Sequence, residues 1–316
     1  MGFTVSSLTN YVNEQSTDLL FALQFEGETA KYANIQTGVK SSEALQIVTN
    51  TPVPQDGTSC GFNASGSTVF TQRLITTKAV KYQDSYCPRD LETKWTQLLL
   101  KAGQHYDEGD IPKKIIDDLV DQINRINETA DWQGDTTAIS SFLNKYDGLI
   151  KLIKAATGTI TATAQSGPVT TTNVRTLMQN VLAGIATSAV LVGNPKVKIF
   201  AGYDVAELYR QKVFIDNLYH VTGQGNQKNM LVEGSVHELI PVHGLDGLKA
   251  NSGDNPFVFA FDPDRNLYLG VDMENEHEQA KMWVDGSDGE TVKYSFRFRR
   301  GWQVAFPSEI VEYSNS

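Results

Sequence analysis

The sequence contains one close group of side chains that could bind a metal or transfer protons, namely Glu274, Glu276, His277 and Glu278. Imidazoles and carboxylates are common metal ligands, and both act as general acids or bases in enzymes. A dense run of charges, however, is more often a solvated strand edge or helix face. We therefore interpret this group as a charge run and assign it no metal or acid–base site.

Other residues of chemical interest lack the neighbours that a reaction would need. Asp262 and Asp264 are spaced as in a calcium loop, but its later glycine and glutamate are missing, so a turn is expected. His237 and His243 flank an apolar segment and are interpreted as core or surface histidines. We find no phosphate-binding loop, dinucleotide fingerprint, strand-to-helix nucleophile elbow, HExxH or paired CxxC motif. No catalytic, cofactor-binding or metal-binding residue is assigned, and the protein is not expected to be an enzyme.

The bulk properties are those of an ordinary folded chain. Its 316 residues are 40% hydrophobic and 20% charged, which predicts one large domain or two closely joined ones. The net charge of −10 argues against a surface that grips nucleic acid or anionic membranes. Cys60 and Cys87 are too few for a disulfide framework, and neither a signal peptide nor a membrane-spanning apolar run is found. We expect a soluble protein made in a reducing cytosol.

One long amphipathic helix is predicted between Asp110 and Gly134. Apolar residues recur along it at the period of one helix face: Ile111, Ile115, Leu119, Ile123, Ile126 and Ala130. Polar residues should face away from this seam: Asp117, Asp118, Asp121, Gln122, Arg125 and Glu128. Asp110 stands at the N-cap position, and Trp132 to Gly134 should form an aromatic anchor and a helix stop. A rod of roughly 30 Å results, and it needs a sheet to lie on.

The first part of the chain predicts two segments that are not stable alone. Residues 1–40 are mostly polar with one apolar patch, Leu19–Phe25, and we expect an arm that packs against another subunit. Residues 41–82 predict two strands joined by a polar, glycine-rich tip, the second strand being Thr68–Tyr82. Because an isolated pair of strands is marginally stable, this pair should find a partner elsewhere, for example on another copy.

The remaining chain predicts an α/β layer and then a long hairpin. Helices are expected at Leu91–Ala102, Ile139–Ala156, Val174–Val190 and Asp204–Phe214, and strands at Lys196–Ala201, Phe257–Phe261 and Leu267–Val271. Between Val292 and Phe306, apolar residues hold positions 292, 294, 296, 298, 302, 304 and 306. This alternation predicts a long strand that pairs with Lys281–Val284 across Asp-Gly turns. The fold class is α+β, and the elements describe an elongated platform.

The order of these parts and the closing sequence together resemble a known family. The order is a polar arm, a long two-stranded loop, an elongated helix ending in Trp-Gln-Gly-Asp, an α/β domain and a long hairpin. The ending, from the Asn266–Gly270 strand through the aromatic and basic strand Tyr294–Trp302 to Pro307–Val311, contains the pattern P-x-x-I-V. Both features resemble the HK97-fold major capsid proteins of tailed bacteriophages. The resemblance covers nearly the whole chain and rests on order and texture, since that family has no catalytic signature.

The resemblance implies a division of the chain. Residues 1–40 would be an N-terminal arm and 41–80 an extended E-loop. Residues 81–133 and 265–316 would form a peripheral domain that contains the long spine helix and the β-hairpin. Residues 134–264 would form an α/β axial domain, whose loops around 223–229 and 247–255 would meet at the centres of pentamers and hexamers.

It also implies a function. The chain would self-assemble into the icosahedral head that encloses the phage dsDNA genome without sequence-specific binding, and it would need no cofactor. It would be made in the host cytoplasm and reside in the virion, next to a portal protein. Since residues 50–77 contain no lysine, the shell should be noncovalent. Because the sequence starts at the arm, a separate scaffold protein, or none, is expected.

Two other functions stay open at this stage. An encapsulin-like nanocompartment shell has the same fold, would hold a cargo enzyme, and should have a groove on its inner face for a cargo peptide. A metal-dependent hydrolase on an α+β scaffold would use Glu274, His277 and Asp264. The hydrolase predicts bound metal and a monomer or small oligomer, whereas both shells predict large assemblies.

Overall fold

A long strand near the C-terminus organises the main sheet. The computed structural model describes residues 16–58, 61–62, 64–87, 110–139, 142–165, 167–216, 230–247, 249–250, 255–272, 279–286 and 291–314. The five strands of the sheet are β1 (Asn34–Gln36), β4 (Lys78–Tyr86), β12 (Leu267–Val271), β13 (Gln279–Val284) and β14 (Val292–Val304). β14 pairs with β12 and β13 along successive parts of its length, and with β4 along residues 292–300. The predicted long strand and its hairpin are confirmed.

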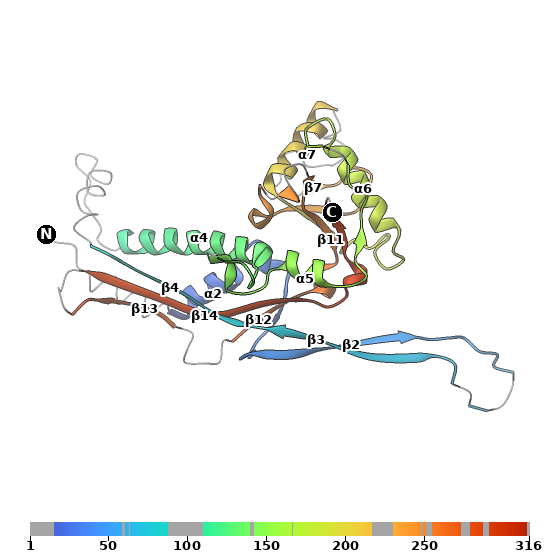
Figure 1. The fold of residues 1–316 in the computed structure, drawn as a ribbon, viewed down its shortest axis with the longest axis horizontal. Coiled ribbons are helices and arrows are strands. Elements are labelled where there is room, and N and C mark those ends of the chain that lie inside the picture. The colour runs from blue at the N-terminus through green and yellow to red at the C-terminus, as the bar shows by residue number, and fades with distance from the viewer. Residues whose placement is uncertain are drawn as a thin grey trace.

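Two helices cover the face of this sheet that carries the even-numbered residues of β14. α2 (Ser16–Phe25) packs against β13, β14 and the long helix α4 (Asp110–Gln133), as Figure 1 shows. The shared core contains these buried residues: Leu19, Leu23, Ile116, Val120, Ile123, Ala280, Met282, Val292 and Phe296. Leu19 and Leu23 of the apolar patch that was expected to pack on another subunit therefore pack on their own chain, between α4 and the sheet.

The predicted helix is confirmed, but its buried face is turned from the predicted one. Ile123 and Ala130 are buried as expected, and Leu119 and Ile126 are only half-buried. The seam instead contains Ile116 and Val120. Glu128, predicted to face solvent, is buried, whereas the other five polar residues of that prediction are exposed. Ile111 and Ile115 lie outside the residues whose side chains are described.

A second sheet lies beyond the C-terminal end of α4 and forms the α/β layer. Its strand order is β5 (Ile160–Thr161), β15 (Val311–Tyr313), β11 (Val258–Phe261), β6 (Lys198–Ala201), β8 (Glu238–Pro241) and β7 (Met230–Leu231). α6 (Val174–Ala186) and α7 (Tyr203–Ile215) contact each other and pack on one face of it. These helices and strands confirm the predicted α/β layer. None of the described helices is both long and apolar enough to cross a bilayer.

Trp132 joins the two sheets. It is fully buried, and its ring lies 5.5 Å from that of Phe259 and 5.9 Å from that of Phe200, on the face of the second sheet opposite α6 and α7. The same core includes Phe298 and Trp302 of β14. The predicted aromatic anchor is confirmed, and it ties the end of α4 to both sheets.

The helix predicted at Ile139–Ala156 is confirmed only in part. Among the described residues of this range, the turn η2 (Phe142–Asn144) and α5 (Leu149–Ala155) are helical, and residues 145–148 between them are not. The N–H of Gly148 donates to the Gly134 carbonyl at 2.8 Å, and a Cβ on Gly134 would lie 2.5 Å from the Tyr146 carbonyl oxygen. This close backbone contact folds the intervening residues into a loop.

The described residues also form several short elements. They are η1 (Ala30–Tyr32), η3 (His243–Leu245), β9 (Lys249–Ala250), β10 (Asn255–Pro256), α9 (Pro263–Asn266) and η4 (Pro307–Glu309). The helix predicted at Leu91–Ala102, the loop 223–229, most of the loop 247–255 and the Glu274–Glu278 group lie outside the described residues.

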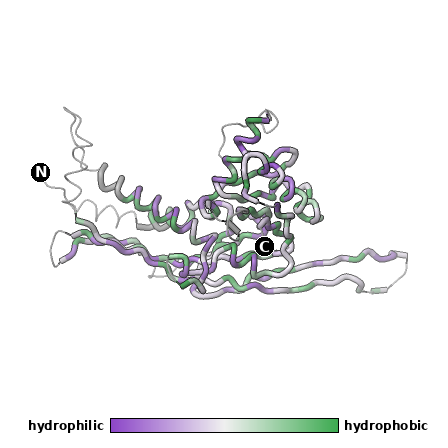
Figure 2. Tube along the Cα trace, turned by 45° about the horizontal axis from the view of Figure 1, so that its top comes forward, coloured by the Kyte–Doolittle hydropathy of each residue, from purple (hydrophilic) through white to green (hydrophobic). Residues whose placement is uncertain are grey.

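β2 (Ser42–Thr51) and β3 (Ser67–Thr76) form an antiparallel ribbon of ten residue pairs. It projects away from the rest of the molecule in two views (Figures 1 and 2). The strand predicted at Thr68–Tyr82 is interrupted at Thr77, where the chain exchanges β2 for β14 as its partner. The two predicted strands and their long tip are otherwise confirmed.

Candidate assembly surfaces

The ribbon exposes apolar side chains that no described residue covers. Val48 and Phe70 are cross-strand neighbours and are 47% and 71% exposed. Leu74, on the same face, is 59% exposed. A cross-strand pair contributes only about 0.2–1 kcal/mol, and a two-stranded ribbon is marginal in water. The ribbon therefore has the composition of a contact surface for another chain.

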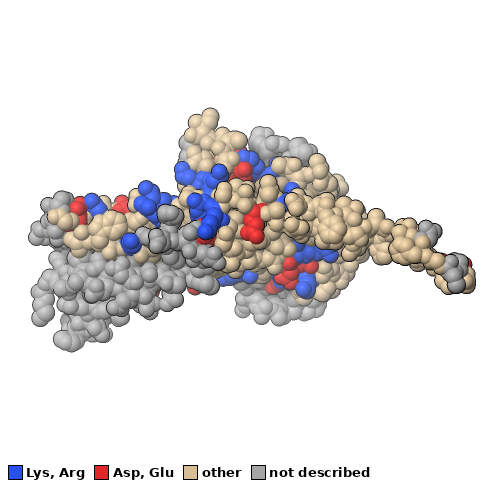
Figure 3. All heavy atoms as spheres, turned by 90° about the horizontal axis from the view of Figure 1, so that it is seen from below, with Lys and Arg blue, Asp and Glu red and all other residues tan. Residues whose placement is uncertain are grey.

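The ribbon has few of the charges that usually prevent exposed strands from pairing with other chains. Glu43 and Arg73 lie near the body, and from Ala44 to Gln72 the only charged residue is Asp56, near the tip. Figure 3 shows that the projecting part is almost free of charged side chains, while the body carries many. Soluble proteins commonly place lysine or other charges on such strands to prevent pairing with other chains. Their absence here favours a docking role.

The face of the main sheet away from α4 is basic. Odd-numbered residues of β14 and their cross-strand neighbours place five cations there: Lys81, Lys281, Lys293, Arg297 and Arg299. Lysine and arginine gather on this side in Figure 3. Lys293 pairs with Asp285 at 2.5 Å, but Lys81 stands directly opposite Arg297, an arrangement that destabilises a sheet. This face suits an acidic neighbour.

A buried ionic cluster fixes the end of α4 on β14. The side chain of Asp131 accepts hydrogen bonds from Tyr146 Oη and Trp302 Nε1, both at 2.6 Å, and from Arg300 Nε at 2.7 Å. Arg300 Nη2 donates to the second carboxylate oxygen of Asp131, and Arg300 Nη1 donates to the Gln24 carbonyl at 2.7 Å. Burial works to lower the pKa of Arg300, but Asp131 raises it above its usual range. Arg300 therefore stays charged, and the cluster joins α2, α4, β14 and the loop before α5.

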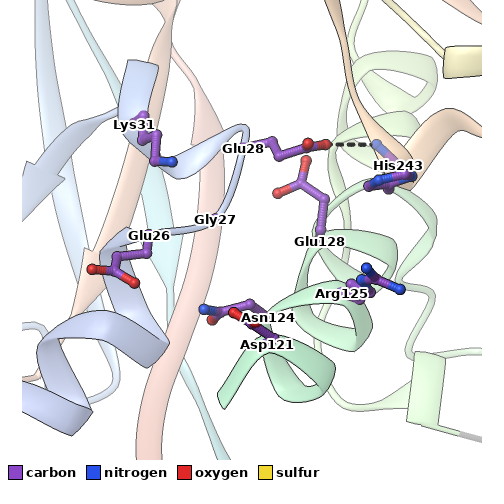
Figure 4. Close-up of a pocket in the computed structure, with 9 residues that line it drawn as sticks. All are labelled: Glu26, Gly27, Glu28, Lys31, Asp121, Asn124, Arg125, Glu128 and His243. Atoms are coloured by element: carbon purple, nitrogen blue, oxygen red, sulfur yellow. Dashed lines mark hydrogen bonds between the residues drawn. The ribbon is translucent and has the colours of Figure 1, made fainter. Parts of the chain in front are cut away.

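A pocket of about 350 Å³ lies between the N-terminal segment, α4 and η3 (Figure 4). Glu28 crosses it, accepting from the Tyr203 hydroxyl at 2.6 Å and from the His243 N–H at 2.9 Å. The carboxylate of Glu128 is directed toward Glu28 and accepts from the Thr29 N–H at 3.1 Å. Burial, followed by repulsion from Asp131, raises the pKa of Glu128 to about 7. The pocket can therefore hold or release a proton near neutral pH.

The candidate site residues from the sequence do not form one site in the described part of the chain. Asp262 caps α9 by accepting from the Asp264 N–H at 3.1 Å, and Asp264 pairs at the surface with Lys196, so the predicted turn is confirmed. His237 is buried beside the Val197 carbonyl, and His243 pairs with Asp246 at 2.7 Å. No group of three or more His, Cys, Asp or Glu side chains suited to a metal occurs among the described residues.

One short segment of the sequence matches a catalytic motif by its letters alone. Residues 57–61 read Gly-Thr-Ser-Cys-Gly, which fits the letters of the GxSxG nucleophile motif. The motif works only where a strand turns sharply into a helix. Here the segment connects β2 to β3, so the context of a nucleophile elbow is missing.

Several solved structures of shell proteins share this arrangement. The chain of the satellite phage P4 procapsid, which includes a size determination protein, matches with a TM-score of 0.59 and 9% identity, covering 95% of this chain and 99% of that one. The capsid of Myoviridae phage XM1 matches with a TM-score of 0.55 and 10% identity, covering 90% of each chain. The protein has the fold of phage capsid proteins. A virus-like particle from Pyrococcus furiosus shares it, with a TM-score of 0.52, 12% identity and coverage of 96% of this chain and 99% of that one. No protein-family model and no curated protein matches this sequence.

Asp131, Arg300 and Glu128 are buried and hold the parts of the body together. On the ribbon, by contrast, Val48, Phe70 and Leu74 are exposed among the described residues. Sequence reasoning missed all three of these buried charges. The available signal was Arg300, the one even position in the alternating strand that is not apolar.

Proposed function

We propose that the chain is the major capsid protein of a tailed bacteriophage. It would self-assemble into pentamers and hexamers that form an icosahedral head around the dsDNA genome. The observation that carries the proposal is the projecting ribbon, whose exposed Val48, Phe70 and Leu74 would be buried by a neighbouring subunit. The match over nearly all of the P4 procapsid chain supports it.

The division into parts follows the same proposal. The ribbon would belong to the E-loop (41–80), and α4 with most of the main sheet would belong to the peripheral domain (81–133 and 265–316), although β1 precedes this range and β4 begins at residue 78. The second sheet lies largely within the axial domain (134–264), although β15 comes from the C-terminus. Residues 1–40 would be the arm, of which α2 and β1 are bound to the body.

Partners and location are part of the proposal. The protein would be made in the host cytoplasm and end in the virion, where it would meet a portal protein and, during assembly, a separate scaffold. With a net charge of −10 per copy, the shell would confine the DNA without binding its sequence. Closed symmetry lets many modest contacts add up to a stable shell.

A second candidate, an encapsulin-like nanocompartment shell, is favoured by the match to the Pyrococcus furiosus virus-like particle. The two candidates differ in content, since a phage head encloses DNA and a nanocompartment encloses a protein cargo. Particles isolated from the natural source and digested with nuclease would distinguish them by protected DNA or a stoichiometric second protein.

The test of shell formation is sedimentation of the purified chain, with negative-stain images of the fast fraction. We expect hollow shells, or rings of five and six. Deleting Pro54–Gly66, the ribbon tip, should leave a folded chain that cannot close shells. A monomer or dimer at every protein and salt concentration, also with the co-expressed scaffold, would contradict the proposal. Normal shells from the deletion would contradict the role of the ribbon.

A further inference from the structure

The root of the ribbon crosses the main sheet at two glycines that face each other. Gly270 of β12 and Gly301 of β14 are direct cross-strand neighbours. A Cβ on Gly301 would lie 2.1 Å from the Thr76 carbonyl oxygen. A Cβ on Gly270 would lie 2.9 Å from Ile75 Cδ1 and 3.0 Å from Thr77 Cγ2. We call this pair the glycine notch, and the residues seated in it, 75–77, the ribbon root.

The ribbon root is tied to the sheet from both of its strands. Thr77 is buried; its N–H donates to the Ser41 carbonyl at 2.9 Å and its hydroxyl to the Val39 carbonyl at 2.8 Å. From β14, Gln303 Nε2 donates to the Leu74 carbonyl at 2.6 Å and Arg299 Nη1 to the Lys40 carbonyl at 2.5 Å. Both strands are therefore held where they leave the body.

The notch differs from an ordinary packing contact because the backbone itself fills it. Side chains can change rotamer to accept a methyl group, but the Thr76 carbonyl can retreat only if the whole chain shifts. Ile75, beside it, is fully buried, so the root has no free space on the body side. A methyl group at position 301 would therefore displace the root outward, away from the sheet.

We propose that the glycine notch sets the direction in which the ribbon leaves the body, and thereby which surface of a neighbouring subunit the ribbon reaches. The inference rests on the proposed shell function. A lever argument gives the scale. Ten residues at ~3.3 Å span about 33 Å, and a shift of about 1 Å over the roughly 7 Å of the root turns the ribbon by about 8°. The end of the ribbon then moves by about 5 Å, enough to miss a contact made by side chains.

The experiment compares three substitutions. Gly301→Ala fills the notch. Thr77→Val keeps the shape but removes the hydroxyl bond to Val39. Gly57→Ala, in the tip with open space around the added Cβ, is the matched control. Spin labels on Thr49→Cys and Lys145→Cys, both exposed sites, in a Cys60→Ser, Cys87→Ser background report the direction of the ribbon through their separation. Circular dichroism reports folding, and sedimentation with negative-stain images reports shells.

We expect folded Gly301→Ala protein with a label separation shifted by several ångströms and with absent or wrongly sized shells, while Gly57→Ala equals the parent. An unchanged separation or shells of the parent size would overturn the inference. If Gly301→Ala does not fold, Thr77→Val decides: a broadened separation and mixed shell sizes support the notch, and parental behaviour refutes it. A parent that forms no shells with any scaffold contradicts the proposed function instead, and the label separation still tests the notch.

Discussion

Replacing Asp131 with asparagine should be among the most damaging single changes in the body of this protein. The substitution keeps the shape of the side chain but removes its charge. Arg300, which is fully buried, would lose its only counter-ion in the cluster and would face an amide in place of a carboxylate. Removing one partner of a buried ion pair typically lowers the free energy of unfolding by about 3–5 kcal/mol. A domain is stable by only about 5–15 kcal/mol, so a large share of the stability would be lost.

The size of the effect depends on the unpaired charge, which a double-mutant cycle can isolate. Arg300→Met removes the cation and leaves Asp131 with its bonds from Tyr146 and Trp302. In the double variant neither charge is stranded, so the loss should be smaller than the sum of the two single losses by about 1–3 kcal/mol. Asp117→Asn, on the exposed face of α4, is the control and should change stability by less than about 0.5 kcal/mol.

Urea unfolding followed by tryptophan fluorescence suits this measurement, because Trp132 and Trp302 are buried around the cluster. The protein must be kept dilute and unassembled, since assembly would add to the apparent stability. A loss below about 1 kcal/mol for Asp131→Asn would refute the reasoning. So would single losses that simply add.

Three further changes follow from the same geometry. The pKa of Glu128 is raised from 4.5 to about 7, so the stability that this group contributes to folding is complete below pH 4.5 and is lost as the pH rises through 7. Glu128→Gln should therefore remove a decrease of at most about 3 kcal/mol in the free energy of unfolding from the pH profile measured by urea unfolding. An unchanged profile would contradict the assignment. Ile123→Asp places an unpaired charge in the seam of α4 and should abolish folding or assembly, as judged by circular dichroism and sedimentation; normal shells would be incompatible with that seam. Arg297→Gln removes the repulsion with Lys81 and should raise the free energy of unfolding by a few tenths of a kcal/mol at low salt, and by less at high salt. A lower free energy of unfolding at low salt would argue against net repulsion on this face.

The long periodic elements could be predicted from the sequence, because their patterns repeat often enough to exceed chance. β14 alternates over thirteen residues and α4 repeats over 24, and both were located correctly. The phase of α4 was only partly right, since Ile123 and Ala130 are buried as predicted but Leu119 and Ile126 are half-buried. The buried seam runs through Asn127 and Asp131, two polar residues that a hydrophobicity pattern assigns to solvent. Their partners lie far away in sequence, so only the tertiary fold shows that they are satisfied.

The errors in the middle of the chain have a different cause. Apolar residues between Ile139 and Ala156 keep a helical spacing. However, Ile139 is exposed, while Leu149 and Ile153 belong to the core around Trp132 that lies between the two sheets. The spacing therefore mixed residues from different environments. The break at Thr77 was hidden for a similar reason, because strand propensity is equal on both sides of a change of partner.

The buried charges at the end of α4 are understandable if the body must hold one shape. Apolar residues would stabilise this joint equally well or better, since buried ion pairs gain little stability over well-packed hydrophobic residues. What the Asp131–Arg300 pair adds is direction, because a bidentate contact with two further donors is satisfied in one arrangement of α4, β14 and the loop before α5. In a closed shell the same angle is repeated in every subunit, so a small error in one body is multiplied around each ring. A joint that tolerates only one geometry, together with a ribbon anchored at the glycine notch, would give every subunit the same reach toward its neighbour.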